Sequence, residues 1–207
     1  YSRARNLHRA AGLVMTEREG KIPGSASELL TLPGIGRYTA GAIASIALNQ
    51  CEPILDGNVK RVLSRLFALR EAVDQTPGQR KLWHLAKTLV ESAGRDCGDF
   101  NQSLMELGAL VCLPENPRCF ACPLQRNCKA HLNGRETDFP VKARRKKIEK
   151  LKTVAAVIWK SGRVLLKQQA ANERWGGLWM FPQWIYTNGK TEEKFVKEMT
   201  RKNFGIQ

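Results

Sequence analysis

The chain lacks any apolar run approaching the roughly 18 residues of a membrane-spanning helix, and its N-terminus has no signal-peptide pattern. It is also short of acids, since 19 Asp and Glu stand against 34 Lys and Arg, for a net charge of +15. Such an excess favours a polyanionic partner. Nucleic acid is favoured over a membrane because no amphipathic basic helix stands out.

Length and composition indicate a globular protein. The chain has 207 residues, of which 43% are hydrophobic and 26% are charged, so it can bury one large core or two small ones. The first residue is Tyr1 rather than Met. We therefore expect the chain to be an internal fragment of a longer protein.

A turn with two glycines, LPGIG at 32–36, leads directly into a helix rich in small residues. The amides at such a helix start lack partners, and the helix dipole adds partial positive charge there. Glycine allows close approach, so a DNA phosphate would fit, although Gly-x-Gly turns are also common without a ligand. Ser25 and Glu28 form a capping box before the turn, so the sequence predicts a helix-hairpin-helix over 25–48.

A single acid, Asp56, follows at the N-terminus of the next predicted helix, in LDGN at 55–58. A turn that can bind a phosphate, followed by one carboxylate in a fixed position, suits chemistry on nucleic acid. The alternative is that Asp56 only caps the helix that it precedes, which is the usual role of an aspartate there.

Apolar residues at helical spacing predict further helices over 3–18, 59–67 and 78–93, and another from Asp99 to Val111. In the 59–67 helix, Lys60, Arg61 and Arg65 are expected on the side away from the apolar stripe.

Four cysteines follow these helices with the spacing C-x6-C-x2-C-x5-C: Cys112, Cys119, Cys122 and Cys128. Four soft ligands this close together suit an iron–sulfur cluster or a structural zinc, and two disulfides are the remaining alternative. Zinc modules usually have two C-x2-C pairs, and here there is one. Cys51 and Cys97 fall outside the set and are expected to be ordinary buried thiols.

The composition changes after residue 132. Residues 133–152 are expected to form a solvated basic linker, with most of its charge at 142–152. The period of the apolar residues then becomes that of strands: 154–159 and 164–166 predict a hairpin around Ser161-Gly162, and 176–182 a third strand. The sequence thus predicts a helical domain over 1–132 and an α/β domain over 153–207.

The glycine turn with its helix, LDGNVKRVL, FNQSLMELGA and the cysteine spacing together resemble the MutY-type adenine DNA glycosylases, members of the helix-hairpin-helix glycosylase superfamily. The resemblance covers essentially the whole chain, through WGGLWMFPQW. The cysteine spacing alone is shared with endonuclease III relatives. Tyr38 and the second domain favour the adenine enzyme.

The resemblance implies a mainly α glycosylase domain with a four-cysteine loop, followed by an incomplete Nudix-like α/β domain that recognises 8-oxoguanine. It implies that the four cysteines hold a [4Fe–4S] cluster. An adenine mispaired with 8-oxoguanine or guanine would be flipped out of double-stranded DNA. Asp56 would stabilise the sugar cation in a site shared with Asn58 and Tyr38. The expected DNA contacts are Leu32, Gly34, Ile35, Gly36, Arg37, Lys60, Arg61 and Arg118.

Two departures qualify the resemblance, and one further position bears on strand cleavage. The family's general acid, a glutamate, lies N-terminal to Tyr1, so this fragment is expected to be inactive alone. Residues 197–202, KEMTRK, offer bases where a Nudix hydrolase needs glutamates for metal. Tyr38 stands where strand-cleaving relatives have a lysine, so a monofunctional enzyme is expected.

Two other functions remain open, a non-catalytic DNA-binding fragment and an endonuclease III-like pyrimidine glycosylase. We expect a monomer without a membrane partner. Its expected place is the nucleoid in the bacterial cytoplasm, or the nucleus in a eukaryote.

Overall fold

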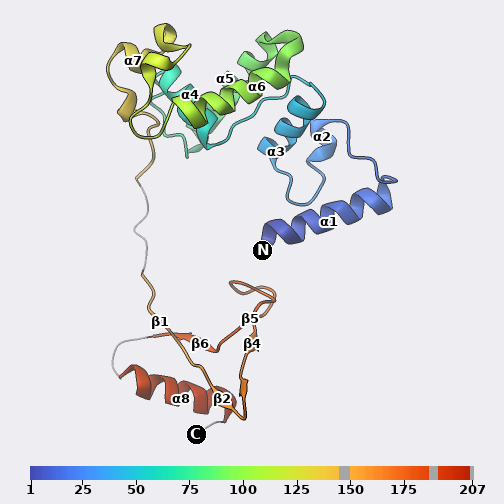
Figure 1. Ribbon diagram of the computed structural model, residues 1–207, viewed down its shortest axis with the longest axis vertical. Coiled ribbons are helices and arrows are strands. Elements are labelled where there is room, and N and C mark those ends of the chain that lie inside the picture. The colour runs from blue at the N-terminus through green and yellow to red at the C-terminus, as the bar shows by residue number, and fades with distance from the viewer. Residues whose placement is uncertain (145–149, 187–190, 206–207) are drawn as a thin grey trace. The chain divides into compact units, whose positions relative to one another are not determined.

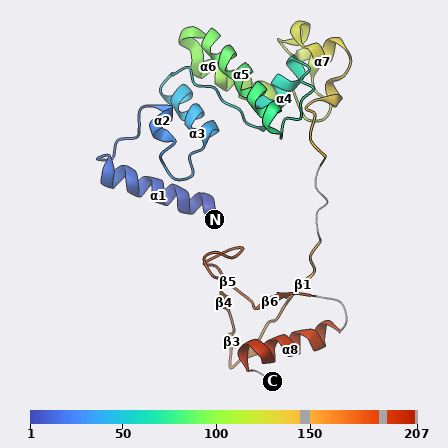
Figure 2. The same ribbon diagram turned by 180° about the vertical axis from the view of Figure 1, so that it is seen from behind.

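The computed structural model describes residues 1–144, 150–186 and 191–205. It divides into two compact units, Tyr1–Arg144 and Arg145–Gln207 (Figure 1 and, from behind, Figure 2). The first unit is helical, and the second contains short strands and a helix. Within the described ranges, each helix is too short or too polar to cross a lipid bilayer.

Except for α7, to which the sequence analysis assigned no element, the α-helices of the first unit agree with those that the sequence predicts, to within a few residues at each end. They are α1 (Ser2–Glu17), α2 (Ala26–Leu29), α3 (Arg37–Ala42), α4 (Gly57–Leu66), α5 (Thr76–Ser92), α6 (Cys97–Glu106) and α7 (Lys129–Leu132). Two of them continue as π-helical turns, α3 through Ile43–Ala47 and α6 through Leu107–Val111.

Both π-helical turns lie where backbones approach closely. A Cβ atom added to Gly98 would lie 2.7 Å from the Ser45 carbonyl oxygen in the first turn. A Cβ atom added to Gly108, in the second turn, would lie 2.7 Å from Cβ of Asn58. Glycine at these two positions therefore allows α6 and its extension to pack directly on the segments that carry the candidate site.

Helix α4 lies in the larger of two apolar clusters. Its Val59, Val62 and Leu63 are at most 3% exposed, and each buried side chain of this size contributes about 1.5–3 kcal/mol. The rest of this cluster comes from neighbouring segments: Ile54, Leu55, Leu69, Val73, Leu82, Ala86 and Leu104. The smaller cluster joins α1 to the hairpin through Ala10, Leu29, Leu32, Ala40 and Ala44.

A disulfide joins Cys51, in the segment before α4, to Cys97, the first residue of α6. The expectation of two ordinary buried thiols is wrong, because Cys51 is exposed and its sulfur is bonded to the buried Cys97. The two residues are 46 positions apart, so only the tertiary contact of these segments brings the sulfurs together.

Hydrogen bonds reinforce the contact beside this disulfide. The Asn49 amide donates to the Arg95 carbonyl oxygen at 2.6 Å, and its Oδ1 accepts from the Gly98 amide at 3.1 Å. Fully buried Asn101 donates through Nδ2 to Ser45 Oγ at 2.8 Å and to the Glu52 carbonyl oxygen at 2.9 Å. The chain that leads from the hairpin to α4 is thus fixed along the start of α6.

The first part of the expected linker packs on the helical unit. Phe139 is buried, and the Val73 amide donates to the Val141 carbonyl oxygen at 2.9 Å. The Ala143 amide donates to Asp74 Oδ1, also at 2.9 Å. The most basic part of that linker, 145–149 with Arg145, Lys146 and Lys147, lies outside the described residues. The remaining linker bases are Arg135, Lys142, Arg144, Lys150 and Lys152.

The second unit contains three antiparallel strand pairs, β1 with β6, β2 with β3 and β4 with β5. The elements are β1 (Thr153–Ala155), β2 (Trp159–Lys160), β3 (Arg163–Val164), β4 (Lys167–Gln168), β5 (Trp179–Met180), β6 (Gln183–Ile185) and α8 (Glu192–Phe204).

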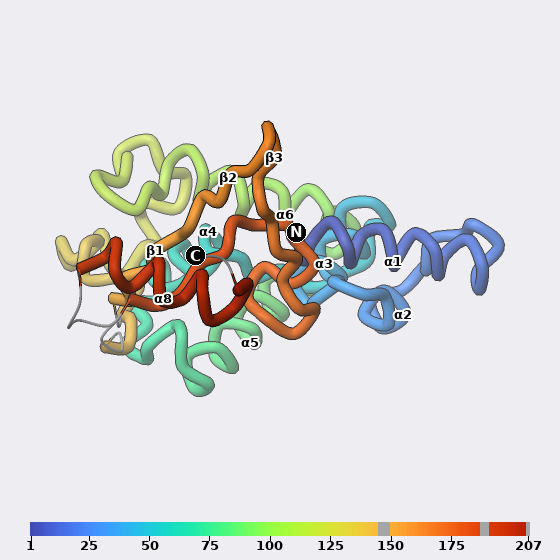
Figure 3. Tube along the Cα trace, turned by 90° about the horizontal axis from the view of Figure 1, so that it is seen from below, coloured from blue at the N-terminus to red at the C-terminus, as the bar shows by residue number. Residues whose placement is uncertain are grey.

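The predicted hairpin is present as β2–β3, whose tip around Ser161-Gly162 points away from α8 (Figure 3). It is shorter than predicted, because Thr153–Ala155 pairs instead with β6. The predicted third strand is β5, which pairs with β4. The sequence analysis assigned no element to β6 or α8. The pairing of β6 with β1 leaves no local pattern, whereas the helical spacing of Phe195, Val196 and Met199 in α8 was available and was missed.

Replacing Cys51 by Ser should lower the free energy of unfolding by about 2–4 kcal/mol, because the disulfide restricts the unfolded chain between two distant positions. The measurement is denaturant unfolding without reductant, followed by far-UV circular dichroism, to which the helical unit contributes most. With a reductant present, the wild-type protein and the Cys51→Ser variant should unfold together. Equal stability of the two proteins without reductant would contradict the prediction.

Candidate active site

The glycine turn connects α2 to α3 and packs against α1. Gly34 has φ of +81°, and a Cβ atom at this position would lie 2.6 Å from Cβ of Asn6, so a side chain fits neither the backbone nor the space. Gly36, the residue that precedes α3, faces open space and has no side-chain cap. The turn is thus closed toward α1 and open at the start of α3.

The expected DNA-contacting residues of the turn differ in exposure. Leu32 is buried in the smaller apolar cluster, and its carbonyl oxygen accepts a hydrogen bond from the Ile35 amide at 3.2 Å. Its side chain is therefore unavailable to a ligand, and a contact of Leu32 with DNA would have to use its main chain. Gly34, Gly36 and Arg37 are exposed, and Ile35 is half-buried.

Asp56 caps α4, as the alternative interpretation predicts. Its Oδ1 accepts a hydrogen bond from the Val59 amide at 2.7 Å. Within the described residues, no other hydrogen bond involves this half-buried carboxylate. The buried side chains of Ile54 and Leu55 anchor the strand-like segment before it. The cap therefore fixes the carboxylate at the helix start and leaves Oδ2 for another partner.

Tyr38, in the first turn of α3, lies within electrostatic range of Asp56. Burial raises the pKa of the Tyr38 phenol, and the negative charge of Asp56 raises it further. The phenol therefore remains protonated at neutral pH and can donate a hydrogen bond. The structure thus brings the start of the hairpin helix within electrostatic range of the acid at the start of α4.

Arg61 links this site to the cysteine segment. One of its terminal nitrogens, Nη2, donates to Asn58 Oδ1 at 2.8 Å and to the Gly108 carbonyl oxygen at 2.6 Å. Its Nε donates to the Cys112 carbonyl oxygen at 2.7 Å. Arg61 is only 9% exposed, so the structure corrects the expectation that it contacts phosphate: its guanidinium is used inside the protein.

Arg65 lies one helical turn further on and is 2% exposed. Its guanidinium donates to four carbonyl oxygens, those of Leu113, Pro114, Glu136 and Phe139, at 2.6–3.2 Å. The expected polar side of α4 therefore carries two buried arginines. A buried cation is tolerated where its donors all find acceptors, and the backbone loops around α4 supply them.

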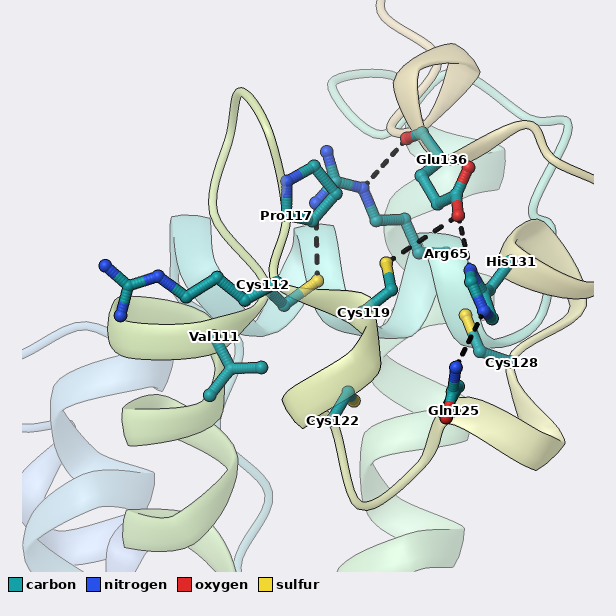
Figure 4. Close-up of a pocket in the computed structure, with 11 residues that line it drawn as sticks. Arg65, Val111, Cys112, Pro117, Cys119, Cys122, Gln125, Cys128, His131 and Glu136 are labelled. Carbon is teal, nitrogen blue, oxygen red and sulfur yellow. Dashed lines mark hydrogen bonds and ion pairs between the residues drawn. The ribbon is translucent and has the colours of Figure 1, made fainter.

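The four cysteines of the C-x6-C-x2-C-x5-C pattern line one cavity (Figure 4). All four are half-buried free thiols, so the structure does not contain the two disulfides of the alternative interpretation. Arg65 Nη1 donates to Cys112 Sγ at 3.4 Å.

Two further side chains reach the same cavity. His131 Nδ1 and Glu136 Oε1 lie 2.5 Å apart, and Cys119 Sγ donates to the same Glu136 oxygen at 3.6 Å (Figure 4). Possible ligand atoms of these three residues all lie within 4.8 Å of one another. Burial and the Glu136 charge raise the pKa of the Cys119 thiol to about 11, and burial raises that of Cys122. Without a metal, these thiols keep their protons.

A second cavity, of about 680 Å³, lies beside Asp56. Asn58 and Lys60 line it from α4, and Glu115 and Lys142 line it from later segments. The sequence analysis did not place Glu115 or Lys142 at the site, because each is more than 50 positions from Asp56, Glu115 within the cysteine segment and Lys142 in the expected basic linker.

The exposed basic residues expected at the DNA interface are Arg37 and Arg118, and Lys60 is half-buried. The Arg37 guanidinium stacks on the ring of Trp83 in α5. The sequence analysis missed Trp83. The available signal was that residues 1–144 contain no other tryptophan.

The comparisons with known proteins agree with this geometry. A family model of the helix-hairpin-helix motif matches residues 17–46. The chain is 36% identical over 206 residues to an adenine DNA glycosylase of Buchnera aphidicola subsp. Schizaphis graminum, covering 100% of this chain and 57% of that protein. It is 49% identical over 131 residues to the Homo sapiens adenine DNA glycosylase, covering 63% of this chain and 24% of that protein.

Solved structures show the same fold. One, of a thermostable thymine-DNA glycosylase, has a TM-score of 0.56 at 32% identity, covering 63% of this chain and 58% of the other. Another, of a non-covalent endonuclease III–DNA complex, has a TM-score of 0.53 at 26% identity, covering 64% and 59%.

The chain spans about half of the Buchnera relative and a quarter of the human one. The similarity to the Buchnera protein nevertheless extends over both units of the chain, and the similarity to the two structures covers nearly two thirds of it. By its hairpin, its fold and its sequence, the chain belongs to the helix-hairpin-helix DNA glycosylases, and its Buchnera and human relatives are adenine DNA glycosylases.

Proposed function

We propose that this chain carries the DNA-binding and bond-breaking residues of an adenine DNA glycosylase of base excision repair. Its substrate would be double-stranded DNA in which adenine is mispaired with 8-oxoguanine or guanine. The main support is the position of Asp56, a carboxylate fixed at the start of α4 within electrostatic range of Tyr38 of the hairpin helix. Such a protein would act where chromosomal DNA is, at the bacterial nucleoid or in a eukaryotic nucleus.

The proposed mechanism uses the charge of Asp56. The adenine leaves the base stack, and positive charge develops on its sugar as the N-glycosidic bond breaks. A carboxylate held next to the sugar stabilises that charge in the transition state. Tyr38 is a protonated phenol at the same site, and Asn58 is held by Arg61. The resemblance assigns no residue of this chain to protonation of the adenine.

In the natural full-length protein, Asp56→Asn should lower adenine excision by at least about 10²- to 10³-fold, because the charge facing the sugar cation is lost. Binding to the mismatched duplex should persist, since an asparagine can still cap α4. The assay is release of adenine from a labelled duplex, with Asp99→Asn, a change at an exposed acid of α6, as control. Full activity of Asp56→Asn would leave Asp56 with a capping role alone.

We further propose that the enzyme is monofunctional. Strand cleavage in relatives uses a lysine amine that forms a Schiff base with the sugar. Tyr38 occupies the matching position, two residues past Gly36, and a phenol cannot form an imine. The same observation argues against the second candidate, an endonuclease III-like glycosylase, which the similarity to the endonuclease III complex otherwise favours.

After base release, the DNA strand should stay intact until alkali or heat is added, and borohydride should trap little covalent protein–DNA product. The Tyr38→Lys variant should gain a trapped product, because it places a primary amine next to Asp56. Strong trapping by the wild-type protein together with strand cleavage without alkali would overturn the proposal. A panel of duplexes with damaged pyrimidines tests the second candidate directly.

We propose that Cys112, Cys119, Cys122 and Cys128 hold a [4Fe–4S] cluster. The residues fit such a group, because four thiols line one cavity without pairing, and thiolates are the ligands of these clusters. The cluster would cross-link the segments between the first and last cysteine. Arg65 would keep its first ligand in place through its bonds to the Cys112 sulfur and the Leu113 carbonyl oxygen.

Protein purified without oxygen should be yellow-brown, with broad absorbance near ~400 nm, and should contain about four iron atoms per chain. Replacing Cys122 by Ser should remove most of the iron. The Cys51→Ser variant should keep it, because Cys51 is bonded to Cys97 and lies outside the cavity. A colourless protein with one zinc and no iron would contradict the cluster and favour the zinc alternative.

A further inference from the structure

One cation of the hairpin is stacked on an aromatic ring from a distant helix. The Cζ atom of Arg37 lies 3.9 Å from the centroid of the Trp83 ring. A guanidinium within about 6 Å of a tryptophan centroid is attracted by the ring's negative face. Arg37 is the first residue of α3, and Trp83 belongs to α5, so this contact joins the open end of the glycine turn to the body of the unit.

The tryptophan is the fixed partner of this pair. Its neighbours Leu82 and Ala86 on α5 are buried. The half-buried Trp83 itself packs against the larger apolar cluster, which contains α4. Arg37 is exposed and, without the ring, would sample many rotamers. The ring therefore limits the orientations of the arginine, and not the reverse.

Stacking leaves the donors of Arg37 available. Its five N–H groups lie in the guanidinium plane and point sideways from the stacked face. In the described parts of the chain, no hydrogen bond or ion pair involves the Arg37 side chain, and its guanidinium lies over the Trp83 ring. The planar edge of a guanidinium matches two oxygens of a phosphate, and a lysine cannot reproduce that geometry.

We propose that Trp83 is a positioning residue, which holds the N–H edge of Arg37 toward a phosphate of the DNA backbone beside the glycine turn. This inference rests on the proposed function, because it takes DNA as the ligand. The ring lowers the conformational entropy that Arg37 loses on binding, so it strengthens binding without touching the DNA.

The first test examines the stack in the absence of DNA. Protein labelled with 5-fluorotryptophan has five fluorine signals, and the Trp83→Phe variant identifies that of Trp83. Replacing Arg37 by Gln should shift this signal, because the cation over the ring is lost. The signals of the four tryptophans in the second unit should not move. An unchanged Trp83 signal would overturn the inference, whatever the DNA affinity is.

The second test is a double-mutant cycle on affinity for a mismatched duplex. Trp83→Leu should weaken binding by about two- to fivefold in the wild-type background. It should have no effect in an Arg37→Gln background, because its effect passes through Arg37. In a Lys60→Gln background, which removes a different cation, the full effect should remain. Trp83→Phe should restore much of the affinity, since it keeps an aromatic face.

The outcomes separate this inference from the proposed function. Arg37→Gln should also lower the dependence of log affinity on log salt by about one unit, as for a lost phosphate contact. Trp83→Leu that weakens binding equally with and without Arg37 would assign Trp83 a purely structural role and overturn the inference. If Arg37→Gln shifts the Trp83 fluorine signal but the wild-type protein binds no duplex, the proposed function is overturned, and the inference with it.

Discussion

Two arginines of one helix are buried, and their charges require oxygen atoms inside the protein. Arg61 and Arg65 of α4 donate to backbone carbonyl oxygens from residues 108–114 and 136–139. A buried cation without acceptors would cost several kcal/mol, so these loops and α4 depend on each other. The same helix begins at Asp56 and faces the cysteine cavity through Arg65. Its position therefore sets the geometry of both candidate sites.

Local features of the fold were predictable from the sequence, and tertiary ones were not. The Ser25 cap of α2, the glycine turn and the Ser161-Gly162 hairpin each depend on a few neighbouring residues, and the structure contains all three. Burial of Arg61 was not predictable, because its acceptors at Gly108 and Cys112 lie 47 and 51 positions away. A charged residue on a helix ordinarily indicates the solvent side, and here distant carbonyl oxygens override that rule.

The candidate site shows the same division. Asp56 and Tyr38 could be identified because each belongs to a short motif, and the structure brings the two within electrostatic range. The capping and catalytic interpretations of Asp56 do not compete. The bond from the Val59 amide uses Oδ1 and orients the carboxylate, which a reacting group needs as much as a helix does. Trp83 and the Cys51–Cys97 disulfide depend on contacts between helices and have no counterpart in a local pattern.

The π-helical turn over Ile43–Ala47 changes the directions in which side chains before and after it point around the helix axis, compared with a regular α-helix. A π-turn accommodates one residue more than an α-turn, and each residue of an α-helix advances its side chain by about 100°. Tyr38 lies before the extra residue, and Ser45 lies within the turn. Helical periodicity extrapolated from the Ser45 end would therefore place the Tyr38 side chain about 100° around the helix axis from its direction in the structure. The extra residue therefore decides which face of this continuous helix presents Ser45 to Asn101 once Tyr38 is fixed at its start.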